Sequence, residues 1–187
     1  IDLLEPVPVV LGGISMGAAI ALRVAARRPD LIRALVLARP AWSDEDKPSN
    51  MQPNTFVGEL LRRYSPDEAL ARFNDSAIAR QLSAESPDNL TSLRSFFSRQ
   101  PISTTAELLC RISADGPNIT RDQLRSILAP TLVVGTARDF VHPLAKAEEL
   151  AALIPSAHMI EITSKSDSRE RYGMEFKAAL ATFLSQI

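Results

Sequence analysis

The 187-residue sequence has 45% hydrophobic residues, 23% charged residues and a formal net charge of −1, a composition typical of a globular protein with one substantial core. This charge balance gives no indication of nucleic acid or of a membrane surface as a partner, and no apolar run approaches the roughly 20 residues that cross a bilayer. Cys110 is the single cysteine, so no internal disulfide is expected. A lone cysteine fits a reducing compartment, and we expect a cytoplasmic protein.

The first part of the chain predicts an α/β segment over residues 1–41. Residues 1–6 resemble the end of a helix that leads into a strand, and there is no initiator methionine. We therefore expect the printed sequence to be the later part of a longer polypeptide, which leaves an upstream targeting segment open. An apolar strand follows at 7–11, then a helix at 16–28 and a second apolar strand at 34–38. Apolar runs without alternation are typical of strands covered on both faces, as in parallel sheets.

Between the first strand and the helix the sequence reads Gly13-Ile14-Ser15-Met16-Gly17. This pentad fits the pattern G-x-S-x-G, in which a sharp turn joins a strand to a helix and exposes the serine at its apex. The serine of such a turn has a strained backbone with positive φ, so we expect Gly13 and Gly17 to be required as small residues where strand and helix approach.

Residues 42–129 predict an all-helical insertion. Ser65 and Thr120 each begin a capping-box pattern, and Ser86 is a further expected helix N-cap. The sequence Asp-Gly-Pro at 115–117 separates the last two helices.

Residues 130–187 predict a second α/β segment, because strand signals return. The expected elements are a strand at 131–135, a loop at 136–142, a helix at 143–153, a strand at 157–162 and a helix at about 169–184. Two strand-helix pairs that flank a helical block are typical of an open parallel sheet, in which sites form at the carboxyl ends of the strands.

The order of these parts resembles the later half of the α/β-hydrolase fold: nucleophile elbow, helical cap, acid-bearing strand, last strand and last helix. The resemblance implies a mostly parallel sheet with an inserted cap and a serine hydrolase acting on an ester, lactone or other acyl compound. It places Ser15 at the nucleophile position and Asp139, four residues after Gly135, at the acid position. The backbone N–H of Met16, which follows the nucleophile, would be one oxyanion donor.

Two features depart from this family's pattern, and the first concerns the missing early strands. The loop that supplies the second oxyanion donor does not appear in the sequence. Without a neighbour, the strand at 7–11 would be an exposed apolar sheet edge, which is an aggregation hazard. We expect an upstream segment or a second chain to cover it.

The second departure is the histidine, because Asp167 stands where the family has its imidazole after the last strand. A carboxylate cannot take the serine proton beside Asp139, since two nearby carboxylates repel each other. His158 begins its strand, far from the site edge, and is expected to be structural. His142 follows Asp139 by three residues and could reach Ser15, or it could simply start the next helix. Lys165 is a third candidate base, with a solvated lysine as the alternative.

Functional alternatives follow from these departures. Arg39, Arg138 and Lys165 lie on loops at the expected site edge, where they could bind an anionic substrate group or be solvated. No metal-ligand spacing and no phosphate-binding glycine loop occurs, so we expect no cofactor. The expected partner is a small-molecule acyl substrate. The competing hypothesis is a non-catalytic protein of the same fold that binds a small molecule or a partner.

Overall fold

A four-stranded parallel sheet forms the centre of the protein. The computed structural model describes residues 7–187, and the helix end expected at 1–6 lies outside these residues. The strands are β1 (Val9–Ile14), β2 (Ile32–Ala38), β3 (Thr131–Gly135) and β4 (Ala157–Glu161), in the spatial order β1-β2-β3-β4. All neighbouring pairs are parallel. The predicted α/β architecture with a parallel sheet is therefore confirmed.

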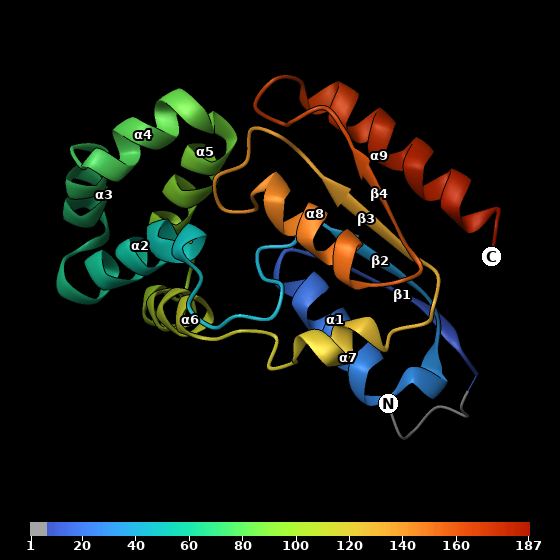
Figure 1. Ribbon diagram of the computed structural model, residues 1–187. Helices are drawn as coiled ribbons and strands as arrows, with labels where there is room; N and C mark the ends of the chain where they lie inside the picture. The colour runs from blue at the N-terminus through green and yellow to red at the C-terminus, as the bar shows by residue number, and fades with distance from the viewer. Residues whose placement is uncertain (1–6) are drawn as a thin grey trace.

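Helices cover both faces of the sheet (Figure 1). The α-helices of the described residues are α1 (Met16–Arg27), α2 (Gln52–Arg63), α3 (Pro66–Asn74), α4 (Ala77–Glu85), α5 (Pro87–Ser95), α6 (Ile102–Ala114), α7 (Arg121–Arg125), α8 (Leu144–Leu153) and α9 (Arg169–Leu184). Helices α1, α7 and α8 pack on one face, where their buried leucines Leu22, Leu124 and Leu150 form one core with strands β2 and β3. Helix α9 packs on the opposite face through Tyr172. The central strands are thus shielded from water on both sides, as apolar parallel strands require.

Helices α2–α6 form a second group to one side of the sheet (Figure 1). They share their own apolar core, in which Phe73 and Val57 are fully buried. The Ser65 hydroxyl accepts a hydrogen bond from the Glu68 N–H at the start of α3, and Thr120 and Gln123 form a complete capping box on α7. The polypeptide enters this helical group from the carboxyl end of β2 and returns through α7 to the amino end of β3.

Strand β1 differs from the sequence prediction, which expected both of its faces to be covered. The side chains of Val9 and Ile14 are 47% and 52% exposed. Ile20 of the adjacent helix α1 is also exposed at 54%. The reason is topological: β1 pairs with β2 on one side and has no partner strand on its other side within residues 7–187.

The turn between β1 and α1 depends on a close approach of two glycines. A Cβ atom at Gly13 would lie 2.0 Å from the carbonyl carbon and oxygen of Gly17, a contact that backbone atoms cannot relieve by rotating. A Cβ at Gly17 would meet no described atom within 4 Å. The expectation that both positions must be glycine is therefore right for Gly13 and wrong for Gly17, because the Cβ direction of a helical residue points away from the strand.

We predict that Gly13→Ala lowers the free energy of unfolding by roughly 3 kcal/mol or more, since the clash is with backbone. Gly17→Ala is the matched control and should leave stability unchanged or raise it by up to about 1 kcal/mol, because alanine favours the helix. Urea unfolding followed by circular dichroism measures both. Equal stability of the two variants would contradict the close approach.

Candidate active site

Ser15 lies at the sharp turn between β1 and α1. Its φ is 56° and its ψ is −118°, the positive-φ conformation predicted for the serine of such a turn. Its backbone N–H donates to the carbonyl oxygen of Ala38 at 3.0 Å, which ties the turn to the end of β2. Met16 is the first residue of α1, so its N–H belongs to the helix-terminal donors that have no partner within the helix.

The loop after β3 brings two further polar side chains to this serine. His142 Nε2 lies 2.8 Å from Ser15 Oγ, and His142 Nδ1 lies 2.9 Å from Asp139 Oδ1. The backbone N–H of His142 also donates to Asp139 Oδ1 at 3.1 Å, so the loop folds back on its own carboxylate. The structure thus joins Ser15, His142 and Asp139 in one hydrogen-bonded chain. Of the candidate bases, His142 is the one that reaches the serine.

The Asp139 carboxylate is held as an anion in a buried place. Its exposed fraction is 5%, and Arg39 Nε donates to its second oxygen, Oδ2, at 2.6 Å. Burial by itself would raise the pKa of Asp139, but the hydrogen bond and charge of His142, together with the charge and hydrogen bond of Arg39, lower this pKa to about 2. Arg39 is therefore part of the site and does not lie in solvent.

Helix α5 holds the loop that carries Asp139 and His142. The Ser86 hydroxyl accepts a hydrogen bond from the Phe140 N–H at 2.9 Å, and Asn89 Oδ1 accepts one from the Val141 N–H at 2.9 Å. Ser86 occupies the N-cap position of α5 as expected, but its side chain makes no capping hydrogen bond. Its hydroxyl instead accepts the hydrogen bond from the loop. The sequence does not reveal this role, because a serine before a helix has the same pattern whether it caps the helix or binds a loop.

The remaining candidates lie apart from the serine. Asp167 forms an exposed ion pair with Arg138, with 2.6 Å between Oδ1 and Nη1. The Lys165 ammonium lies 4.7 Å from the centre of the Tyr172 ring. His158 pairs with Leu132 three residues before the carboxyl end of β4, as its predicted structural role requires.

A cavity of about 330 Å³ opens on Ser15 and His142. The sheet contributes residues at its carboxyl edge, and the helical group supplies most of the apolar wall. Lining residues from the helical group include Asn54, Asn89, Leu93, Phe96, Leu108 and Ile112. A largely apolar cavity with a few polar groups is the usual form of a small-molecule site.

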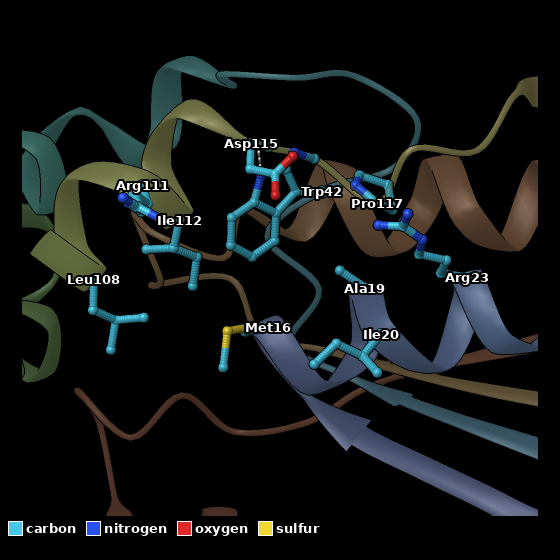
Figure 2. Close-up of a pocket in the computed structure, with 11 residues that line it drawn as sticks. Met16, Ala19, Ile20, Arg23, Trp42, Leu108, Arg111, Ile112, Asp115 and Pro117 are labelled. Carbon is cyan, nitrogen blue, oxygen red and sulfur yellow. Dashed lines mark hydrogen bonds between the residues drawn. The ribbon is translucent and has the colours of Figure 1, made fainter. Parts of the chain in front are cut away.

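A second cavity of about 270 Å³ adjoins the first and shares Met16, Leu108 and Ile112 with it. Figure 2 shows Trp42 in its centre, Met16 and Ile20 of α1 on one side and Leu108 on another, with Arg23 at its far end. The Trp42 indole N–H donates to the carbonyl oxygen of Asp115 at 3.0 Å, which fixes the ring in this position. The two cavities together give an extended, mainly apolar region that begins at Ser15.

Residues 7–187 lack two other kinds of feature. No group of three or more His, Cys, Asp or Glu side chains in this part of the chain is arranged to hold a metal ion. Among the same residues, no helix has the length and apolar character needed to cross a membrane.

Residues 1–165 match the family model of the alpha/beta hydrolase fold. The chain belongs to this family. It is 32% identical over 152 residues to a protein of Rhizobium rhizogenes named "Putative carbamate hydrolase RutD". This match covers 79% of the chain and 55% of that protein. The chain is also 31% identical over 135 residues to a homoserine O-acetyltransferase of Cryptococcus neoformans. That match covers 67% of the chain and 24% of the acetyltransferase.

Solved structures agree with membership of the alpha/beta hydrolase family. The crystal structure of an alpha/beta hydrolase enzyme from a Medee basin deep-sea metagenome library superposes with a TM-score of 0.72 and 21% identity. That superposition covers 100% of the chain and 68% of the metagenome enzyme. Since identity is this low, the superposition supports the fold alone, and the predicted resemblance to the α/β-hydrolase superfamily is confirmed by the family match. The chain spans about half and about a quarter of the length of the two curated relatives.

We predict that the Asp139→Asn variant is less stable than the wild-type protein above about pH 5, and that the difference between their free energies of unfolding becomes smaller as the pH falls. The folded pKa of Asp139, about 2, lies below the ordinary value of 3.8. The stabilisation of about 2 kcal/mol that follows from this difference is therefore complete above about pH 5, roughly half lost at about pH 3 and absent below about pH 2. Urea unfolding at several pH values measures this difference in the free energy of unfolding. Asp122→Asn, at a side chain that is 89% exposed, is the control. A difference between Asp139→Asn and wild type that does not change with pH would contradict the prediction.

Proposed function

We propose that the protein is a serine hydrolase that acts on an ester, a lactone or another acyl compound. The observation that carries this proposal is the hydrogen-bonded chain from Ser15 Oγ through the His142 ring to the Asp139 carboxylate. Nucleophile, base and orienting acid in this order are what acyl transfer to a serine requires. Membership of the alpha/beta hydrolase family, with a carbamate hydrolase and an acetyltransferase among the relatives, supports the same class of chemistry.

In the proposed mechanism, His142 Nε2 accepts the Ser15 proton as Oγ attacks the acyl carbon. The Nδ1–H of the ring donates to Asp139, which orients the imidazole and stabilises its charged form. The Met16 N–H donates to the developing oxyanion, at the positive end of α1. The protonated His142 then transfers its proton to the leaving alcohol or amine. Water attacks the acyl-serine with His142 again as base, which releases the acid and restores Ser15.

The cavities support a substrate with a mainly apolar body. We propose that residues 42–129 are inserted between two α/β segments, 1–41 and 130–187, and that helices α2–α6 of this insertion act as a cap, while α7 packs on the sheet. Leu108 and Ile112 of α6 support this role, because they line both the cavity at Ser15 and the cavity that adjoins it. With an acyl group in one cavity and a leaving group in the other, the scissile bond would lie where the two cavities meet. Met16, the residue after Ser15, lines both cavities at this point. We further propose that an additional chain segment supplies the second oxyanion donor and covers the outer edge of β1.

We predict that Ser15→Ala and His142→Ala each lower kcat/KM for an activated ester such as a p-nitrophenyl ester roughly 10⁴-fold. The reason is that either change removes an atom of the proton-transfer chain. Ser92→Ala is the matched control, because Ser92 lines the same cavity and has no part in that chain. Its kcat/KM should remain within about threefold of the wild-type value.

Covalent labelling provides an independent measurement. A fluorophosphonate should attach to Ser15 in the wild-type protein and in Ser92→Ala, and mass spectrometry of the digested protein locates the adduct. Absence of both turnover and labelling, with ester binding retained in Ser15→Ala, would support the non-catalytic binding protein instead.

A further inference from the structure

Arg39 is the first residue after β2, and its side chain enters the site from the strand that lies between those of Ser15 and Asp139. Its φ is 46°, a conformation that is rare for a non-glycine residue. The whole residue is 8% exposed. A buried arginine with a strained backbone needs strong compensating interactions. They are found at Asp139.

The contacts of Arg39 fix the Asp139 carboxylate. Arg39 Nε binds Oδ2 at 2.6 Å, while Oδ1 faces the His142 ring. With one oxygen on each partner, the carboxylate cannot rotate without breaking a charge-assisted hydrogen bond. Arg39 Nη2 also lies 3.3 Å from His142 Nδ1, so the guanidinium is close to the ring as well.

This proximity creates an electrostatic difficulty. During the proposed reaction the His142 ring becomes positively charged, and a positive guanidinium beside it opposes that charge. Arg39 also neutralises Asp139, the group that stabilises the imidazolium in a Ser-His-Asp triad. Asp139 and Arg39 alone therefore present the ring with a net charge of zero.

Asp88 is a second buried carboxylate beside Arg39. It lies in the first turn of α5 and is 9% exposed, and its Oδ2 is 4.0 Å from Arg39 Nη2. Its other oxygen accepts a hydrogen bond from Arg169 at 2.9 Å. The Arg169 side chain is 69% exposed, so water screens its charge more than that of the buried pair. The three buried groups Asp139, Arg39 and Asp88 together carry a charge of −1, equal to that of a single triad aspartate, whereas the positive charges of Arg169 and Lys165 belong to less buried side chains.

We propose that Arg39 and Asp88 are positioning residues for the Ser15-His142-Asp139 site, Arg39 by fixing the Asp139 carboxylate and Asp88 by restoring the negative charge that the imidazolium requires. This inference rests on the proposed hydrolase function for its kinetic consequences. The other charged or titratable groups around Arg39 are Arg169 and Tyr172 on α9 and Lys165 before it. Burial raises the pKa of Tyr172 and lowers that of Lys165.

The proposal predicts pH shifts of opposite sign in two variants. Arg39→Met removes a positive charge beside the ring, so the acidic limb of kcat/KM against pH should move to higher pH. Asp88→Asn removes a negative charge, so the same limb should move to lower pH. In the double variant, Arg39→Met with Asp88→Asn, the acidic limb should lie close to its wild-type pH. In both single variants kcat should fall roughly 10- to 100-fold. KM should change by less than about threefold in Asp88→Asn, because Asp88 is not among the residues that line the cavity, whereas Arg39 lines it, so kcat and the pH profile carry the test for Arg39→Met.

Asp167→Asn is the matched control, since Asp167 is a carboxylate at the same end of the sheet that is paired with Arg138. It should leave kcat and the acidic limb unchanged. Arg39→Lys keeps the charge but loses the fixed geometry of the guanidinium. The acidic limb of Arg39→Lys should stay at the wild-type pH, while its kcat should fall below the wild-type value.

An NMR titration of the ring tests the same proposal without turnover. The chain has two histidines, so His158→Gln assigns the His142 signal. Opposite shifts of the His142 midpoint in Arg39→Met and Asp88→Asn support the proposal even if no ester is hydrolysed. Unshifted His142 midpoints in both variants, or shifts of the same sign, would overturn the proposal. Absence of turnover in the wild-type protein would overturn the hydrolase function alone.

Discussion

The parallel register of β1, β2 and β3 is the constraint on which the candidate site depends. Because the three strands run in the same direction, their carboxyl ends meet at one edge of the sheet. The residues that follow these ends are Ser15, Arg39 and the loop that carries Asp139 and His142. Groups a hundred or more residues apart in the chain are thus within hydrogen-bonding distance. The apolar strands supply this order through burial on both faces of β2 and β3.

Helix α5 is the second support of the site. Its N-terminal turn contributes Ser86, Asp88 and Asn89, which contact the Phe140 N–H, Arg39 and the Val141 N–H respectively. A loop of this length would otherwise leave buried backbone N–H groups without acceptors. The helical group therefore does more than line the two cavities, because it also fixes the conformation of the loop that carries His142. Changes in this group are expected to couple substrate shape to the geometry of His142.

The position of the histidine shows where sequence reasoning stopped. The strained turn at Ser15 and the position of Asp139 after β3 could be predicted, since each depends on a local pattern and on its place after a strand. His142 stayed one of several candidates, because the distance between a loop imidazole and the serine depends on how residues 136–142 fold. That fold is set by hydrogen bonds to Ser86 and Asn89, which lie about 50 residues earlier in the chain. Arg39 could be placed at the edge of the sheet, but its pairing with Asp139 could not.

The sequence by itself determined the order of strands and helices, the strained serine turn and the membership of the fold, because these follow from hydrophobic periodicity, capping residues and glycine at the point of closest approach. Only the tertiary structure decided which side chains share the site. It brought His142 to Ser15 and placed Asp88 beside Arg39, and it left Asp167 paired with Arg138 outside. The physical reason is that a hydrogen bond needs its donor and acceptor placed to within a few tenths of an ångström, and residue patterns along the chain do not specify this placement for segments remote in sequence.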